Sequence, residues 1–226
     1  MNWFRRDRAE WDSKAAKAVP LTGIAKTDRA GPPASAPAPP TDGPVLQHIA
    51  GDGHQVAPLT PELGPVILHI TYDGPGDFVV DALDGKLRSA SQLVYAEGPF
   101  SCRSLINADD EKVRAVRVQA DGPWSVDAVP VSTALGLHSQ VRRPASDVLR
   151  YEGGPGIATL RHEGDPNTDD GGYFLVDTFE VDGSGFVDQL ANHIGPWSGE
   201  APLTGPCLIF VRSDGPWSIS VHTLEG

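Results

Sequence analysis

Apolar and polar residues alternate in short runs along most of the chain after residue 43, and Gly, Pro and Asp separate the runs. The run 66–72 is apolar and β-branched, and it lies between Gly64-Pro65 and a Gly- and Pro-rich turn at 73–76. Such runs are typical of strands. They recur at intervals of roughly eight to twelve residues, as in all-β sandwiches and small barrels. We therefore predict an all-β fold.

Two of the turns are expected to join paired strands. Residues 78–80 follow the run 66–72 after a short turn, so we predict that these two runs form a hairpin. The runs 116–120 and 124–128 place apolar side chains at every second position on both sides of Asp-Gly-Pro. This alternation is typical of half-buried antiparallel strands, so we predict a second hairpin there.

One stretch of the chain occurs twice. Residues 121–126 read Asp-Gly-Pro-Trp-Ser-Val, and residues 214–219 repeat them with Ile at the end. Gly98-Pro99-Phe100 likewise matches Gly195-Pro196-Trp197, and the separation between matching residues drifts between 90 and 97 positions. Self-similarity of this kind indicates a duplicated unit. We predict two tandem antiparallel β-sandwich (or small barrel) repeats, at 44–130 and 134–224.

The repeated motif contains the tryptophans Trp124 and Trp217, each at the start of the last strand of its repeat. Alternation places both rings on the inward face, and Gly, Asp and Pro supply the turn before them. We therefore interpret both tryptophans as structural core residues. The alternative is a pair of exposed rings that form a ligand platform.

The first 43 residues differ from the rest. Residues 1–20 predict a short amphipathic helix, in which Trp3, Phe4 and Trp11 form an aromatic stripe beside basic residues that include Arg5 and Arg6. Pro20 ends this leader, and residues 21–43 read as a Pro-rich disordered linker. The leader is expected to bind a protein partner or the membrane face. The alternative is that its aromatic residues dock on the chain's own body.

The net charge of −12 is concentrated in the body of the chain. Residues 1–43 hold seven Lys and Arg against five Asp and Glu, which leaves eleven against twenty-five, or −14, for residues 44–226. An acidic body argues against nucleic-acid binding, which needs Lys and Arg. The N-terminus lacks the apolar core of a secretory signal, and no run is long enough to span a membrane. We expect a cytoplasmic protein, peripheral to the membrane if the leader binds there.

Catalytic motifs are missing from the sequence. Neither a nucleophile elbow nor a phosphate-binding or dinucleotide-binding glycine motif is present, and the seven histidines are scattered. Cys102 and Cys207 fall at different places in the two repeats, so we interpret both as ordinary thiols. The chain is therefore not predicted to be an enzyme, and no small-molecule substrate is identified.

An acidic loop at 163–172 is present only in the second repeat. Asp165, Asp169 and Asp170 are weak candidate ligands for a metal, because Ca²⁺ takes oxygen ligands from acidic loops of this kind. The loop lacks the order of an EF-hand and its terminal Glu. The alternative is a solvated loop tip with no cofactor bound.

Residues 8–22 contain Trp11-Asp12-Ser13 followed by Ala15-Ala16. They resemble the basic leader that precedes some actinobacterial TerD-like tellurium-resistance and stress proteins. The repeated Gly-Pro-Phe/Trp and Asp-Gly-Pro-Trp-Ser signatures are similar to those of β-sandwich repeats from that group. The resemblance implies a β-sandwich in a stress-related assembly. The TerD-like calcium loops have no match here, so the resemblance does not imply metal ligands.

Together these features favour a non-catalytic tandem β-sandwich adaptor in a bacterial stress-related assembly, docked through its N-terminal helix. One alternative is a TerD-like protein that binds divalent cations, calcium in particular. Another is a glycan-binding β-sandwich that uses Trp197 near the Gly-Pro turn.

Overall fold

The computed structural model describes residues 43–60 and 63–224. The helix predicted over residues 1–20, with Trp3, Phe4, Arg5, Arg6 and Trp11, lies outside the described residues. So does the predicted linker up to residue 42. The described residues belong to one compact unit of the chain.

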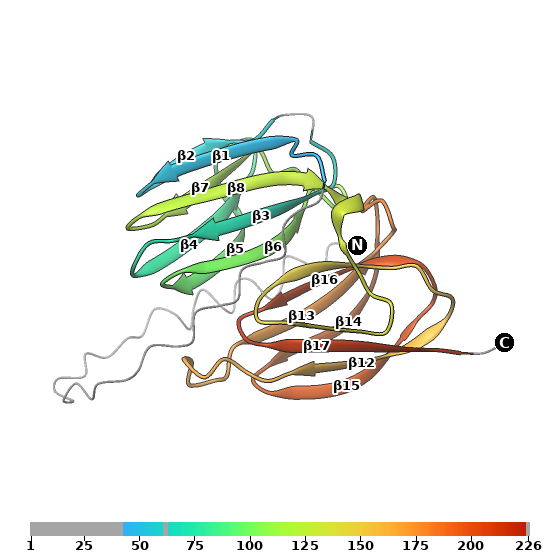
Figure 1. Cartoon of the computed structure of the whole chain (residues 1–226). Helices are drawn as coiled ribbons and strands as arrows, with labels where there is room; N and C mark the ends of the chain where they lie inside the picture. Colours follow the sequence, from blue (N-terminus) through green and yellow to red (C-terminus); the bar gives the residue numbers. More distant parts are fainter. Residues whose placement is uncertain (1–42, 61–62, 225–226) are drawn as a thin grey trace. The chain divides into compact units, whose positions relative to one another are not determined.

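These residues form an all-β structure, which confirms the predicted fold class (Figure 1). The strands make four sheets, and their pairs are antiparallel except where the two-residue β9 runs parallel to β11. The only helical element in the described part of the chain is a 3₁₀ turn, η2 (Val131–Thr133). The strands are β1 (Gln47–Asp52), β2 (Gln55–Pro58), β3 (Val66–Tyr72), β4 (Asp77–Leu83), β5 (Ser89–Glu97), β6 (Phe100–Ile106), β7 (Ala115–Gln119), β8 (Pro123–Pro130), β9 (Leu135–Gly136), β10 (Gln140–Arg143), β11 (Asp147–Tyr151), β12 (Gly156–His162), β13 (Tyr173–Phe179), β14 (Phe186–Ile194), β15 (Trp197–Leu203), β16 (Cys207–Ser213) and β17 (Trp217–Thr223).

The four sheets follow one strand order twice. The first two have the orders β1-β8-β3-β6 and β2-β7-β4-β5. Adding nine to each strand number gives β10-β17-β12-β15 and β11-β16-β13-β14, which are the orders of the other two, with β9 added beside β11. Matching strands therefore hold matching places in the two pairs of sheets.

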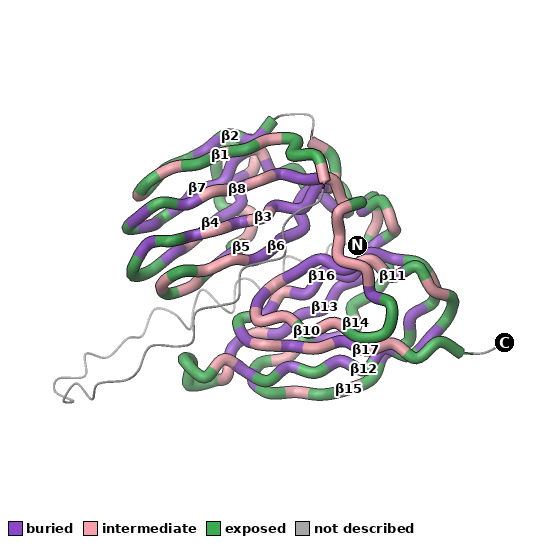
Figure 2. Tube along the Cα trace, viewed as in Figure 1, coloured by how far each residue is buried: buried purple, intermediate pink, exposed green. Residues whose placement is uncertain are grey.

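Each pair of sheets encloses its own hydrophobic core, so the architecture is sandwich-like. Buried and exposed residues alternate along many strands, most regularly along β12 (Figure 2). Trp124 is 3% exposed in the first core and Trp217 is fully buried in the second. Their indole N–H groups donate to the carbonyls of Gly53 at 2.9 Å and Ala145 at 2.8 Å. Both rings thus lie on the inward face, where the alternation placed them, and their polar atoms are satisfied.

The two predicted hairpins are wrong. β3 pairs with β6 and β8, whereas β4 pairs with β5 and β7 in the other sheet. β7 and β8 are likewise in different sheets. The turns at 73–76 and 120–122 therefore carry the chain across the sandwich. Two strands with apolar inward faces can bury them against each other by lying in opposite sheets, so alternation alone does not show which strands pair.

The Asp-Gly-Pro corners explain the glycine of the repeated motif. A Cβ atom on Gly122 would lie 2.8 Å from the Cα of Gly74, and one on Gly215 would lie 2.4 Å from the carbonyl oxygen of Gly164. Both distances are shorter than van der Waals contact. Glycine is therefore required where two crossing turns approach each other.

A third apolar cluster joins the two sandwiches. It brings residues of the first sandwich, from strands β3, β6 and β8 and from Ala108 after β6, against β11, β13 and β16 of the second. The buried members are Ile67, Leu105, Ala108, Val129, Val148, Phe179, Leu208 and Phe210. The contact is heterologous, because it uses the β1-β8-β3-β6 sheet of one sandwich and the β14-β13-β16-β11-β9 sheet of the other.

Candidate functional site

Three loops meet at one end of the second sandwich, where the chain crosses between its sheets. The amide of Gly195 donates to the carbonyl of Gly172 at 2.8 Å, and that of Glu163 donates to Pro216 at 2.8 Å. The amide of Asp214 donates to Tyr173 at 3.1 Å. Backbone hydrogen bonds thus connect the loops 163–172, 195–196 and 214–216 into one platform.

An open groove of about 500 Å³ lies at this end. Arg161, His162 and Glu163 line it from the end of β12, and Pro196, Trp197 and Ser198 line it from the start of β15. In the β12–β15 ladder His162 pairs with Trp197 and Arg161 pairs with Ser198. The groove therefore rests on a regular sheet.

Trp197 lies in a ladder of aromatic rings that holds it in place. Its ring stacks on His193 with a centroid distance of 4.2 Å, and it meets Phe174 at 6.1 Å. The ring of Phe174 in turn stacks on His162, with a centroid distance of 5.0 Å. Trp197 remains partly exposed. His193 thus covers one face of the indole.

His162 is 2% exposed, and its two ring nitrogens differ. Nδ1 lies 2.9 Å from the carbonyl oxygen of Gly195, so this nitrogen carries the proton and donates. Nε2 is buried and has no hydrogen-bond partner among the described residues. Tyr72 holds the matching place in the first sandwich, where its hydroxyl donates to Pro75 and accepts from the amide of Asp121. The second sandwich therefore has an unused acceptor where the first has a closed corner.

The surroundings of the groove are acidic. Arg142 pairs with Glu163 at 2.8 Å. Asp214 accepts from the amide of Tyr173 at 2.8 Å. Burial raises the pKa of Asp214, and the negative charges of Asp165 and Asp170 raise it further. The loop thus gathers carboxylates close enough to act on one another.

The predicted metal ligands Asp165, Asp169 and Asp170 lie in the loop 163–172. Asp165 accepts from the amide and side chain of Asn167 at 2.9 and 3.0 Å, and Asp170 accepts from the amide of Gly172 at 3.1 Å. Asp169 is exposed. Among the described residues, no three His, Cys, Asp or Glu side chains are grouped to hold a metal ion. Asp165 and Asp170 thus accept hydrogen bonds within their own loop, and metal binding by Asp165, Asp169 and Asp170 stays a prediction.

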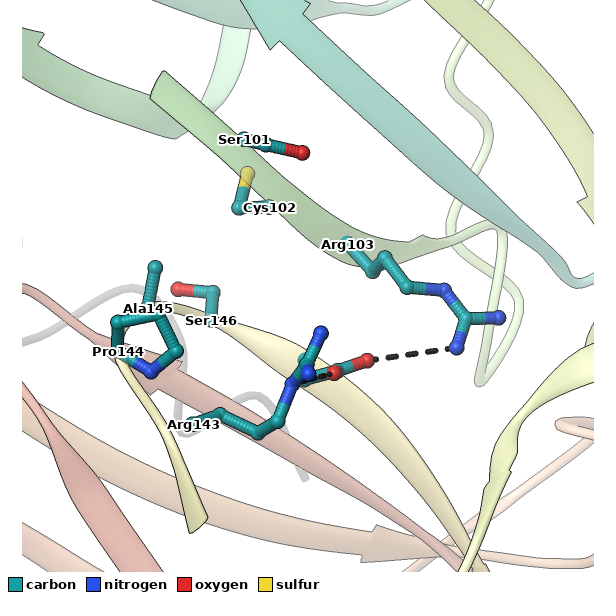
Figure 3. Close-up of a pocket in the computed structure, with 8 residues that line it drawn as sticks. Ser101, Cys102, Arg103, Arg143, Pro144, Ala145 and Ser146 are labelled. Atoms are coloured by element: carbon teal, nitrogen blue, oxygen red, sulfur yellow. Dashed lines mark hydrogen bonds and ion pairs between the residues drawn. The ribbon is translucent and has the colours of Figure 1, made fainter. Parts of the chain in front are cut away.

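A second polar cluster lies where the sandwiches meet (Figure 3). Asp147, 1% exposed, contacts Arg103 from the other sandwich at 3.5 Å and Arg143 at 2.8 Å. Arg103, 4% exposed, also donates to the carbonyl of Thr133 at 2.6 Å. Burial raises the pKa of Asp147, against the opposing effect of the two guanidinium groups. The cavity beside them, about 10 Å³, has room for one water molecule at most.

Cys102 and Cys207 are free and buried, in agreement with their interpretation as ordinary thiols. Burial raises the pKa of each thiol. Neither sulfur is therefore prepared to act as a nucleophile, which requires the thiolate.

The pattern of the sequence did not indicate His162, Arg103 or Asp147 as site residues. Each is a polar residue at an inward or junction position of an otherwise apolar strand. This break in the apolar pattern is the feature of the sequence that could have indicated them. No protein-family model matches this chain, and no curated protein matches it significantly. Among the described residues, no helix has the length and apolarity that would let it cross a membrane.

Proposed function

We propose that this protein is a non-catalytic interaction protein built from two β-sandwich repeats, at 44–130 and 134–224, that arose by duplication. The strand order that recurs with a shift of nine supports the duplication. The groove around Trp197 is the proposed recognition site. The basic, aromatic leader is proposed to supply a second contact, to a partner protein or the membrane face, on sequence evidence alone.

The groove carries the proposal because it combines a fixed scaffold with an incompletely covered tryptophan. Trp197 is held by His193 and Phe174 yet remains partly exposed. Tryptophan and arginine are enriched among the residues that dominate binding energy in protein interfaces. Arg161 and Ser198 pair on the exposed face of the same sheet, whereas Trp197 and His162 pair on its inward face. Loops that a rigid scaffold positions are the common place for such sites.

The experiment compares two variants of equal bulk on one sheet face. Ser198→Tyr fills the groove, whereas Thr159→Tyr places the same ring on exposed β12 outside the groove. We expect an affinity-tagged full chain with Thr159→Tyr to retain the binding partners of the wild type from its source cells. Ser198→Tyr should lose them. Equal retention by both variants would remove the groove from the function.

The leader is tested separately. Deletion of residues 1–20 should reduce recovery of the partner or of membrane-associated chain. Full recovery after the deletion would show that the leader has no anchoring role.

A further inference from the structure

We infer that the contact between the two sandwiches is pH-sensitive, because protonation of His69 weakens the interaction of Arg103 with Asp147 and loosens the segment 143–147 from the first sandwich. The inference concerns the junction and does not depend on the groove. Its evidence comes from the position of this segment, the row of polar side chains that leads to it and the surroundings of His69.

The segment 143–147 joins β10 to β11 in the second sandwich and closes the edge of the first. The amide of Arg103, on the edge strand β6, donates to the carbonyl of Ser146 at 3.0 Å. Ala145 is 5% exposed and packs in the core cluster of the first sandwich. Cys102 is 3% exposed and lines the same small cavity as Ala145 and Ser146 (Figure 3). Loosening of the segment would therefore uncover Cys102.

A row of side chains crosses the outer sheet face of the first sandwich toward this segment. His69, on β3, pairs with Asp127 of β8 on one side and with Arg103 of β6 on the other. Asp127 pairs in turn with the exposed His48 of β1, whose Nδ1 lies 2.6 Å from the carboxylate. Paired residues of neighbouring strands lie on one face of a sheet. At the inner end of the row, Arg103 contacts the carboxylate of Asp147 at 3.5 Å.

His69 lies among groups of opposite charge. Nε2 of its ring lies 3.2 Å from the hydroxyl of Ser101. The charged groups that act on the ring come from β8, from β6 and from the segment 143–147, and they are Asp127, Arg103, Asp147 and Arg143. Burial lowers the pKa of His69 below its ordinary value of 6.5, and the guanidinium groups lower it further against the opposing effect of the carboxylates. The ring is therefore neutral in the folded chain above pH 6.5.

A proton on His69 adds a positive charge where two guanidinium groups already share one carboxylate. Arg103 and Arg143 both contact Asp147, and Nε of Arg103 is buried with no partner among the described residues. Because folding lowers the pKa of His69, the unfolded chain takes up this proton more readily. The stability that neutral His69 contributes is therefore complete above pH 6.5 and declines as the pH falls from there toward the folded-state pKa.

Asp147 titrates in the opposite direction. Burial raises its pKa above the ordinary 3.8, so its ionisation lowers the stability of the fold as the pH rises above that value. The test must therefore compare chains that differ at His69 alone.

The test measures how fast Cys102 reacts with a disulfide reagent in the folded, full-length chain. Cys207→Ala leaves Cys102 as the single thiol. In this background the chain with His69 is compared with His69→Gln, which keeps a hydrogen-bonding side chain. It is also compared with His69→Thr, which copies Thr159 at the matching place in the second sandwich. Neither replacement can take up a proton.

The measured quantity is the reaction rate of the His69 chain divided by that of each variant, which cancels the pH dependence of the thiol itself. Relative to pH 8, we expect this ratio to rise at least about threefold by pH 5 with both variants, since one unit of pKa difference between two states changes their equilibrium about tenfold. In chains that also carry His48→Gln the rise should remain, because that change removes the exposed histidine at the far end of the row.

Urea midpoints at pH 8 identify the variants that fold. A ratio that stays constant from pH 8 to pH 5 with a folded variant would overturn the inference. So would a rise that His48→Gln abolishes, since the response would then belong to the exposed histidine and not to His69.

Discussion

At the scale of single residues, several polar side chains that enter the sandwiches are held by specific partners. Trp124 and Trp217 bury large rings and still satisfy their N–H groups. Asp177 receives hydrogen bonds from Gln189 and Arg212 at 3.1 Å each. Three buried side-chain nitrogens have no partner among the described residues: Nε of Arg103, Nε of Arg212 and Nε2 of His162. Of these three residues, His162 is the one that lines the groove.

Asp84 has a carboxyl group whose titration can be measured directly. It accepts from the amides of Lys86 and Arg88 and from the guanidinium of Arg88 at 2.9 and 2.7 Å. These bonds lower the pKa of Asp84 to about 2 from 3.8. The folded state therefore gains stability from Asp84 above pH 3.8, and that gain is lost as the pH falls toward 2.

We expect NMR titration of the Asp84 carboxyl to give a midpoint near pH 2. Arg88→Gln should return the midpoint toward the ordinary value, because the guanidinium bond is the largest cause of the shift. A midpoint of about 4 in the wild type would show that the pair does not form in solution.

At the scale of elements, the sequence predicted where strands lie more successfully than how they pair. The period-2 alternation at 124–128 falls inside β8, and the run 66–72 coincides with β3. Alternation depends only on which side chains face the core, which is a local property. Pairing depends on where the chain goes at each turn, and the corners at 73–76 and 120–122 cross between sheets instead of forming hairpins.

The candidate site was predicted less completely, for a related reason. Trp197 and the acidic loop could be recognised from their composition. The surroundings of His162 could not be recognised in this way. Its Nδ1 binds Gly195 and its ring stacks on Phe174, and both residues come from other parts of the chain. The buried pair of Arg103 and Asp147 joins residues 44 positions apart in different sandwiches, which no local pattern reports.

The Asp-Gly-Pro corner gives a prediction at this scale. Gly215→Ala would place a methyl group 2.4 Å from the carbonyl oxygen of Gly164, so one of two backbone turns must shift. We expect the free energy of unfolding to fall by about 1–3 kcal/mol, as for other overpacked sites. Urea denaturation measures the change. Gly154→Ala is the matched control, since no atom lies within 4 Å of its added Cβ, and a comparable loss there would contradict the steric explanation.

At the scale of the whole molecule, the junction between the sandwiches contains both apolar and charged contacts. The cluster around Phe210 and Ile67 excludes water. Arg103 and Asp147 lie beside it and are buried, and Arg143 adds a second, half-buried positive charge. A buried pair of this kind is costly to break from one side, because the remaining charge stays buried without compensation.

We therefore expect Asp147→Asn to destabilise the chain by about 3–5 kcal/mol, since Arg103 and Arg143 lose their shared carboxylate. The double variant Arg103→Met with Asp147→Leu removes both charges of the inter-sandwich pair and should cost less than the single change. Urea unfolding of the intact chain compares the two. A double variant less stable than Asp147→Asn would show that packing, and not charge, dominates this place.

The heterologous contact between the sandwiches has a consequence for self-association of the chain. The contact joins unlike faces, so no twofold axis closes it. Each sandwich therefore leaves one of its two faces uncovered, and in principle another copy of the chain could bind there by the same kind of contact. The residues at the corresponding register positions of the terminal faces are more polar than those at the junction. Arg117 pairs with Asp81 in the register that Phe210 keeps with Asp177, and His222 faces Ile157 as Val129 faces Ile67. A guanidinium group and an imidazole thus hold the register positions that the apolar residues Phe210 and Val129 hold at the junction.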